Sequence, residues 1–496
     1  MRERSRGRGP VRPVSRPTVP RRLNFARAGG LLLVLEVVGA AIGFVSTVYF
    51  ATVLGAVSLG IFFLFEALLA TLATFSDFGL RGAVEKRISE TDDPGEAGAM
   101  VTATILLKLV LLSAFGVVVM LFRGPINAYI GANVAAPLIG AAVVYELSSL
   151  TVHVLRGELR VGETALLYFL RLVSYVGVAV VLIQLGYGVS ALIYGLLVSY
   201  VVLLVSGVTR VETSLVRPSR RHFLSLLAYA KYNGIWALGG HVYNTMDLLV
   251  IGFFLSQAHV AGYEIAWRLT LMASLFGGIV GNTVFAQLSA WTAHEEFDRV
   301  QATVRESITA SLFFVIPSFF GVLVLSRDIL GVVFGPEYLL AAGALVVLMG
   351  EKLVAGVNVV FDAAVRGFDR PDIGAYATVG SLTLNVLLNV ALVPRYGLVG
   401  AAAATGIAMA LNTLVLGVFF DRLLPISIAW NDIGWCIGAG IGMAAILAGV
   451  GVIVRPTTLL VLVGHVLVGG LVYTALVLAS PSLRRKVIGN VRAFIG

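Results

Sequence analysis

The sequence has little charge, one cysteine and six histidines. Charged residues make up 13% of its 496 positions, whereas a soluble domain carries about 25%. The single cysteine, Cys436, excludes an internal disulfide and a cysteine cluster for zinc. The histidines are scattered, with no pair at the spacing of helical metal ligands. We therefore predict no metal site and no cofactor.

Apolar residues dominate what remains. They form 58% of the chain, and the mean hydropathy is +0.94. Many apolar runs reach about 20 residues, enough to cross a hydrocarbon core of about 30 Å as a helix. A β-barrel would instead show segments of about 10 residues that alternate in polarity. The composition predicts an all-α polytopic membrane protein surrounded by membrane lipids.

The apolar runs divide into about fourteen expected membrane spans. Their approximate bounds are 28–54, 59–80, 98–122, 134–155, 164–185, 189–209, 225–255, 260–290, 306–326, 338–365, 373–394, 398–420, 433–454 and 458–480.

The distribution of basic residues predicts the orientation. An even number of spans places both termini on one side. If that side is the cytoplasm, the outer loops keep only Arg123, Arg327, Arg395 and Arg455, which agrees with the positive-inside rule. We therefore expect a multi-pass protein of the plasma membrane with cytoplasmic termini. The net charge of +9 then reflects the inner loops, and we predict no nucleic-acid partner.

The first 27 residues are rich in Arg and Pro and contain too little apolar surface to fold alone. Arg21-Arg22 ahead of an apolar run has a slight likeness to a twin-arginine export signal. The long following run contains Glu36 and leads into another span. We favour a disordered basic cytoplasmic tail over residues 1–27.

A charged turn occurs twice in the chain. "LRGELR" at 155–160 and "VRGFDR" at 365–370 both read Arg-Gly-x-x-Arg, and we call them the Arg-Gly turns. Each is followed by a Tyr-Gly pair, at 187–188 and 396–397. Earlier in each half, Gly60 matches Gly262 and Ser89 matches Ser289. These matches predict that spans one to six are duplicated as spans seven to twelve.

The duplication predicts the domain organisation. Each unit has an even number of spans, so both run the same way, related by a pseudo-twofold axis along the membrane normal with substrate held between them. We expect six-helix lobes at 28–222 and 223–432, and two extra helices with a cytoplasmic tail at 433–496. The Arg-Gly turns would lie at the inner mouth. There, Arg156 and Arg366 either set the orientation or also attract anionic headgroups.

Three stretches carry a resemblance to a known family. They are "AVSLGIFFLFEALLATLATFSDFGLRGAVEKRISE", "NTMDLLVIGFFLSQAHVAGYEIAWRL" and "VRGFDRPDIGAYATVGSLTLNVLLNVALVPRYGLVGAAAATGIA". They resemble the oligosaccharide flippase branch of the multidrug/oligosaccharidyl-lipid/polysaccharide exporter superfamily. The resemblance implies two lobes around a central cavity, alternating inward and outward opening, and export of a glycan on a polyprenyl phosphate or pyrophosphate. In some relatives, the two extra helices form a groove for a lipid tail.

Ionisable residues at membrane depth are costly, so they pair or face water. An anionic lipid phosphate would require buried cations in a hydrated cavity. The alternative is a set of structural ion pairs, and a pair between Lys108 and Glu146 is credible because the two lie at one depth. We expect Glu351 and Lys352 to point in different directions, with at least one facing the cavity. The candidate substrate-binding cations are Lys108, Arg171, Lys231, Arg268 and Lys352.

A second group of residues is predicted to act in gating or ion coupling. In the repeat, Glu66 falls on Arg268, so we expect them to meet across the pseudo-twofold axis and close an outer gate. The competing possibility is that Arg268 binds Asp247 or Glu264 locally. His241 is either a packed histidine or a proton-coupling site. The gate or coupling candidates are Glu66, Asp247, Glu264, His241 and Glu36.

These observations favour an alternating-access flippase for a polyprenyl-linked oligosaccharide, driven by the membrane potential, H⁺ or Na⁺. The main alternative is a cation-coupled multidrug antiporter of the same superfamily, which would bind its cargo with buried carboxylates. A membrane glycosyltransferase would need a larger outer loop, and a purely structural scaffold gives no reason for buried charges of both signs. We therefore predict a transporter, not an enzyme.

Overall fold

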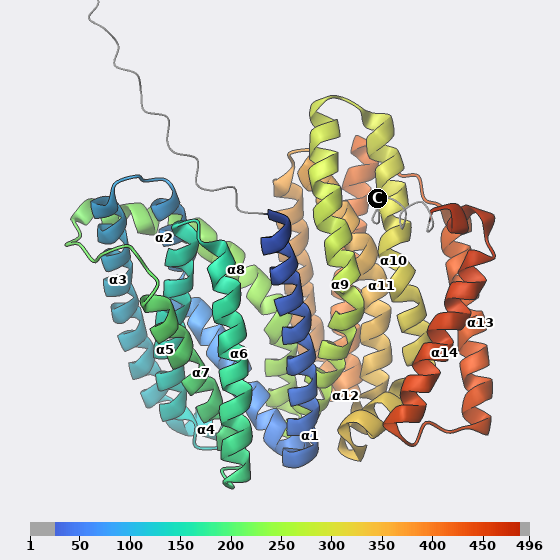
Figure 1. The fold of residues 1–496 in the computed structure, drawn as a ribbon, viewed down its shortest axis with the longest axis horizontal. Helices are drawn as coiled ribbons and strands as arrows, with labels where there is room; N and C mark the ends of the chain where they lie inside the picture. Colours follow the sequence, from blue (N-terminus) through green and yellow to red (C-terminus); the bar gives the residue numbers. More distant parts are fainter. Residues whose placement is uncertain (1–24, 487–496) are drawn as a thin grey trace, which may run out of the picture.

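The computed structural model describes residues 25–486, apart from the side chains of 25–34, of residue 371 and of positions scattered over 232–242 and 275–286. Every regular element in this range is a helix (Figure 1). The first half contains α1 (Phe25–Asp77), α2 (Leu80–Ser89), α3 (Pro94–Leu121), α4 (Arg123–Ile130), α5 (Ala135–Gly157), α6 (Val161–Gln184) and α7 (Ser190–Val208).

The second half begins with α8 (Arg220–Phe254), α9 (Gln257–Ala293) and α10 (Phe297–Asp328). A π-helical turn η1 (Ile329–Phe334) and a 3-10 turn η2 (Pro336–Ala341) follow. The chain then continues through α11 (Ala342–Gly367), α12 (Pro371–Leu423), α13 (Trp430–Ile453) and α14 (Leu459–Leu478).

Two glycines divide the longest helices. Gly55 in α1 has φ 76° and Gly397 in α12 has φ 57°, a region that glycine enters without the steric penalty of a side chain. Each of these helices therefore comprises two of the predicted spans. Among the described residues, ten helical segments are long and apolar enough to cross a membrane, and two of them contain these glycines. The chain is an all-α, multi-pass membrane protein, in agreement with the composition.

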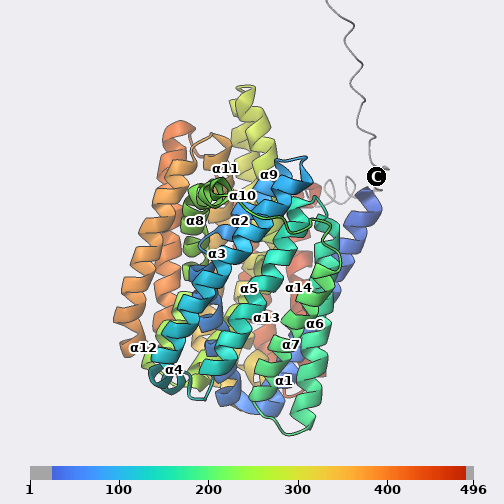
Figure 2. The same ribbon diagram turned by 90° about the vertical axis from the view of Figure 1, so that its left-hand side faces the viewer.

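The predicted span bounds agree with the helices to within a few residues, with one clear difference. Helix α10 begins at Phe297, well before the predicted residue 306. Its first turns contain Asp298 and Arg299, so the apolar signal starts later than the helix does. Figure 2 shows that α9 and α10 extend beyond the neighbouring helices here.

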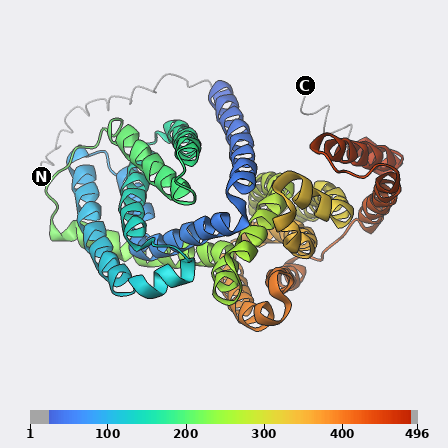
Figure 3. The same ribbon diagram turned by 90° about the horizontal axis from the view of Figure 1, so that it is seen from below.

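The two halves lie side by side, with α13 and α14 at the edge of the second half (Figure 3). We call α1–α7 the first lobe and α8–α12 the second lobe. Helix α8 contacts α2 and α3 of the first lobe and α12 of the second. The expected boundary between residues 222 and 223 falls within the first turn of α8 and stays a prediction.

The duplicated Arg-Gly turns have the same backbone geometry. Leu159 and Asp369, which occupy matched positions, have φ 61° and φ 56°. The carbonyl of Leu155 accepts a hydrogen bond from the Arg160 N–H (2.9 Å), and Val365 accepts one from Arg370 (3.2 Å). This shared conformation supports the predicted duplication.

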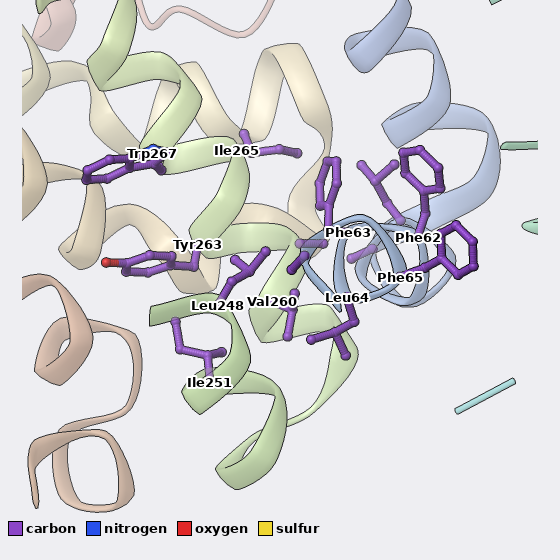
Figure 4. Packing of buried hydrophobic residues seen from close by; sticks show 14 of the residues in the cluster. Phe62, Phe63, Leu64, Phe65, Leu248, Ile251, Val260, Tyr263, Ile265 and Trp267 are labelled. Atoms are coloured by element: carbon purple, nitrogen blue, oxygen red, sulfur yellow. The ribbon is translucent and has the colours of Figure 1, made fainter. Parts of the chain in front are cut away.

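The bundle has two distinguishable ends. We call the end with α2 and the Arg-Gly turns the basic end; it is uppermost in Figure 1. The distal end contains Gly55, α4, η1 and η2. Here apolar side chains of α1 at 62–65 pack against α8 and α9 (Figure 4). A Cβ atom at Gly60 would lie 1.8 Å from the Gln257 carbonyl oxygen, so only glycine allows this close approach of the lobes.

Hydrogen bonds also join the lobes at the distal end. The Ala56 N–H donates to Glu337 Oε2 (2.7 Å), and the Tyr338 hydroxyl donates to the Ala51 carbonyl (3.4 Å). A third bond joins α4 to α8, in which the Tyr129 hydroxyl donates to the Leu249 carbonyl (2.7 Å). The distal end is therefore closed.

Candidate functional site

Lys108 is buried and neutralised inside the first lobe. Its side chain is 1% exposed, and Nζ lies 2.5 Å from both Asp77 Oδ1 and Glu146 Oε2. The expected pair with Glu146 is present, and Asp77 is an additional partner. Asp77 also accepts a hydrogen bond from the Gly79 N–H at the end of α1 (3.1 Å). This geometry favours the structural alternative for Lys108.

Lys352 is also paired locally. Its Nζ lies 2.7 Å from Glu351 Oε2 and 3.9 Å from the centre of the Trp267 ring. Both side chains are nearly inaccessible, so the expectation that one of the two faces the cavity is wrong. Sequence neighbours on a helix point in different directions, but a lysine side chain is long and flexible enough to fold back onto its neighbour.

Arg268 on α9 bridges the lobes. Its Nε donates to Glu264 Oε1 (2.6 Å), and Nη2 approaches Glu66 Oε2 on α1 (3.5 Å). The guanidinium also lies 4.7 Å from the centre of the Phe63 ring. The expected contact with Glu66 and the competing contact with Glu264 are therefore both present. Arg268 remains 43% exposed, so one face is open to a ligand.

Arg171 on α6 is the cation that local carboxylates do not neutralise. It has no acidic partner in the described part of the chain, and its guanidinium lies 5.3 Å from the centre of the Tyr200 ring. Arg171, Arg268 and Glu66 line one cavity of about 160 Å³ bounded by α1, α6 and α7 of the first lobe and by α9. We call it the central cavity. Its other lining residues are Gly43, Ser46, Thr47, Phe50, Leu59, Phe62, Phe63, Leu172, Tyr175 and Leu196.

The central cavity adjoins two further spaces. Arg268, Gly43 and Thr47 also line a hollow of about 200 Å³. Leu269 and Met272 line both that hollow and an apolar groove of about 450 Å³. The groove lies between α9, α10, α11, α13 and α14. Shared lining residues thus connect the central cavity, which contains Arg171 and Arg268, with the apolar groove.

Asp247 on α8 is buried among neutral hydrogen-bond donors. It accepts hydrogen bonds from the Tyr263 hydroxyl (2.5 Å), from Asn389 Nδ2 (2.7 Å) and from the Thr405 hydroxyl. No basic residue in the described range pairs with it. The Oδ1 atoms of Asn385 and Asn389 are buried without a hydrogen-bond partner. These five residues, which we call the Asp247 cluster, gather oxygen atoms around one carboxylate.

The remaining predicted residues lie outside the central cavity. His241 Nε2 lies 2.9 Å from the Thr71 hydroxyl and so links α8 to α1. Glu36 and Lys231 are exposed. Arg366 pairs with Asp362 (2.8 Å), and Arg156 is half-buried in the Arg-Gly turn of the first lobe. The structure brings Arg171, Arg268, Glu66 and Glu264 together. The residues that lie elsewhere are His241, Glu36, Lys231, Arg366 and Arg156.

Ion pairs at the basic end hold its carboxylates charged. The hydrogen bond from His153 Nδ1 (2.5 Å) lowers the pKa of the Glu85 carboxyl. Hydrogen bonds from Lys86 and Arg87 likewise lower the pKa of Glu90. The basic side chains of α2 are thus partly engaged in ion pairs with neighbouring carboxylates.

The fold and cavities define a membrane transporter, and comparisons with known proteins agree. Residues 50–342 match the family described as "Polysaccharide biosynthesis protein". The chain is 40% identical over 468 residues to a probable low-salt glycan biosynthesis flippase, Agl15, of Haloferax volcanii, covering 94% of this chain and 98% of that one. It is 30% identical to a probable flippase, AglR, of the same organism, covering 79% and 82%.

A solved structure shares the fold. The lipid II flippase MurJ in an inward closed conformation superposes with a TM-score of 0.79 at 16% sequence identity, covering 92% of this chain and 99% of that one. The protein is thus a transporter and not an enzyme. It belongs to the oligosaccharide flippase family of the multidrug/oligosaccharidyl-lipid/polysaccharide exporter superfamily, as the three quoted stretches predicted.

Proposed function

We propose that this protein flips a polyprenyl-(pyro)phosphate-linked oligosaccharide across the plasma membrane by alternating access. The observation that carries this proposal is Arg171, a cation without a carboxylate partner in the described range, which shares the central cavity with Arg268. Arg171 is half-buried and makes no ion pair in the described range, and a charge held partly out of water without a partner is unfavourable. An anionic ligand that enters the cavity would compensate it, because arginine binds phosphate oxygens through two parallel hydrogen bonds.

The neighbouring spaces suit the rest of an amphipathic lipid. A phosphate at Arg171 and Arg268 would lie beside the hollow that Arg268 also lines. From there Leu269 and Met272 lead into the apolar groove between α9, α10 and the two extra helices. We assign the polyprenyl tail to this groove, where it stays in an apolar environment while the headgroup crosses.

The direction of transport follows from the orientation that we propose. With the basic end in the cytoplasm, as the positive-inside rule predicts, the closed distal end faces outward. The Glu66–Arg268 contact between the lobes would then form part of the outer gate. Binding of a phosphate to Arg268 would compete with Glu66 and so weaken this contact. This competition couples loading of the substrate to opening of the gate.

We assign ion coupling to the Asp247 cluster. A buried carboxylate without a basic partner gains most from a proton or a small cation. The unpartnered oxygens of Asn385 and Asn389 would complete the surroundings of Na⁺, since hard cations take oxygen ligands. The same carboxylate is also the feature that favours the multidrug antiporter. However, a cationic drug would be repelled by Arg171 in the central cavity.

The test is translocation in proteoliposomes. Purified protein is reconstituted, and the movement of a polyprenyl-pyrophosphate-linked oligosaccharide is compared with that of a cationic dye. We expect the wild type to move the glycan lipid and Arg171→Ala to lose this activity. Movement of the dye alone, or glycan movement unaffected in Arg171→Ala, would contradict the proposal.

A further inference from the structure

The second lobe contains a polar cavity that the mechanism above does not use. It has a volume of about 270 Å³ and lies between α8, α11 and both halves of α12. We call it the amide pocket. Its lining residues are Gly240, Tyr243, Asn358, Asp362, Thr378, Ser381, Leu382, Ala408, Met409 and Asn412.

Neutral polar groups form a connected network in this pocket. Asn358 Nδ2 donates to Asn412 Oδ1 (2.9 Å), and Asn412 Nδ2 donates to the Ser381 hydroxyl (3.1 Å). The carbonyl oxygen of Asn358, Oδ1, accepts no hydrogen bond from the described part of the chain. The pocket therefore presents a fixed amide network with an acceptor still available.

The pocket is also close to electrically neutral. Asp362 is its one acidic lining residue, and Arg366 neutralises it at 2.8 Å. No lysine or arginine is among the described residues that line the pocket. A phosphate would find no cation here, and an organic cation would find no spare negative charge. The chemistry instead suits an uncharged ligand with several hydroxyl groups.

The repeat relates the amide pocket to the central cavity. At the offset that matches the two Arg-Gly turns, Arg171 falls on Ser381 and Leu172 falls on Leu382. Arg171 and Leu172 line the central cavity, and Ser381 and Leu382 line the amide pocket. The same structural position thus carries a cation in the first lobe and a hydroxyl in the second.

The pocket lies close to the seam between the lobes. Gly240 lines it, and the next residue, His241, contacts Thr71 of the first lobe (2.9 Å). A Cβ atom placed at Gly240 would meet no atom within 4 Å, so there is open space beside this part of α8. A ligand whose phosphate is held at Arg171 and Arg268 could therefore direct its uncharged portion toward this pocket.

We infer that the amide pocket binds one sugar unit of the lipid-linked glycan while the central cavity holds the phosphate. This inference rests on the proposed function. The volume is below the range of about 300–1,000 Å³ that holds drug-sized ligands, which suits a single sugar ring. Asparagine side chains donate and accept at once, as sugar hydroxyls require. Recognition of the glycan would then be spatially separate from recognition of the phosphate.

The first experiment compares two lipids. Proteoliposomes containing wild type, Asn358→Leu or Asn412→Leu are given polyprenyl phosphate, or the same lipid carrying a single hexose as a mixture of glucose, galactose and mannose forms. We expect each variant to slow movement of the hexose lipid about tenfold, since each loses one or two hydrogen bonds to the sugar. Movement of the sugar-free lipid should be unchanged. The matched control is Thr383→Ala. Thr383 is exposed and lies on α12, the helix of Asn412, but outside the pocket.

The second experiment does not require transport. Cys436 is the single cysteine and is replaced by alanine, after which Thr378→Cys places a thiol in the amide pocket and Leu172→Cys places one in the central cavity without removing Arg171. Labelling by a small thiol reagent is followed with each lipid present. We expect the hexose lipid to slow labelling at residue 378 at least fivefold and the sugar-free lipid to leave it unchanged.

The outcomes separate the two proposals. Equal protection of residue 378 by both lipids, or protection by neither, overturns the sugar assignment. If residue 172 is nevertheless protected, the proposed phosphate site stands. Absence of protection at both residues contradicts both assignments. Loss of movement of both lipids in Asn358→Leu and Asn412→Leu, with labelling at residue 378 unprotected, assigns the amide network a structural role and likewise overturns the inference.

Discussion

The two lobes have the same turns but differ in their buried charge. In the first lobe, Lys108 is neutralised by two carboxylates, and Arg171 faces the central cavity without one. In the second lobe, Lys352 is neutralised by its neighbour, and Asp247 is surrounded by neutral donors. Among the described residues, the charge without an ion-pair partner is therefore positive in the first lobe and negative in the second.

Substitutions at matched positions account for part of the difference. The offset that relates Arg171 to Ser381 also relates Tyr175 to Asn385 and Ala179 to Asn389. In the first lobe these positions give an arginine and an aromatic ring beside the central cavity. In the second, Asn385 and Asn389 give part of the Asp247 cluster. The matched positions of α6 and α12 thus supply the cation of the first lobe and the neutral amides around Asp247 in the second.

The largest expected effect is on stability, from Lys108→Ala. This change leaves Glu146 buried without its cation and Asp77 with Arg81 alone (3.1 Å), and removing one partner of a buried pair costs about 3–5 kcal/mol. Thermal unfolding in detergent measures the loss. Adding Glu146→Gln should restore part of it, because the uncompensated charge at residue 146 disappears. An unchanged melting temperature would mean that Lys108 is not a structural cation.

Arg171→Ala should show the opposite pattern, in which transport falls and stability does not. Loss of a desolvated charge contact costs about 2–5 kcal/mol, so flipping of the glycan lipid should fall about a hundredfold. No ion pair is broken in the described structure, and the melting temperature should not decrease. Arg171→Lys keeps the charge and should retain part of the activity. Equal activity of Arg171→Ala and wild type would remove Arg171 from the substrate site.

Asp247→Asn tests the negative charge of the second lobe. Asparagine has nearly the same shape but cannot release a proton and binds a cation weakly, so flipping should lose its dependence on an imposed Na⁺ or H⁺ gradient. We expect about a tenfold loss of the driven rate, which corresponds to about 1.4 kcal/mol. Asp372→Asn, which changes an exposed carboxylate outside the Asp247 cluster, is the control. Driven transport that persists in Asp247→Asn would place the coupling group elsewhere.

Glu66→Gln should have the smallest effect. Glu66 is 33% exposed, and its contact with Arg268 is long, so the pair contributes about 0.2–1 kcal/mol. The distal end should therefore open two- to fivefold more often. The labelling rate of a cysteine at Leu59, which lines the central cavity, measures this opening in a Cys436→Ala background. A slower labelling rate would show that Glu66 does not hold the gate closed.

Much of the fold could be predicted from the sequence. Apolar runs of sufficient length located the helices, and the repeated Arg-Gly turns indicated the duplication that the shared positive φ at 159 and 369 supports. Depth along the helices suggested the Lys108–Glu146 pair, and the repeat suggested that Glu66 and Arg268 meet. Each of these predictions depended on residues that are conspicuous in an apolar sequence.

The parts of the site that were not predicted depend on neutral polar residues, which stand out less in an apolar sequence than charged ones do. Asn385, Asn389 and Thr405 are neutral, and their meeting at Asp247 requires the packing of three helices. The asparagines at i and i+4 within an apolar run were the available signal. Asp77, at the end of α1, was not predicted as a partner of Lys108, yet it reaches Nζ of that residue. The mutual pairing of Glu351 and Lys352 depends on side-chain conformation, which helical periodicity does not fix.

The contacts that close the distal end determine which substitutions can change how often that end opens. Ala51 and Ala56 take part through their main-chain carbonyl and N–H groups, and Gly60 through the absence of a side chain. Ala51 and Ala56 are buried, so their main-chain bonds can be kept while their side chains stay small, whereas changes at Glu337 or Tyr338 would remove these bonds. Substitutions in η2, a six-residue turn, can thus change how often this end opens without altering either arginine.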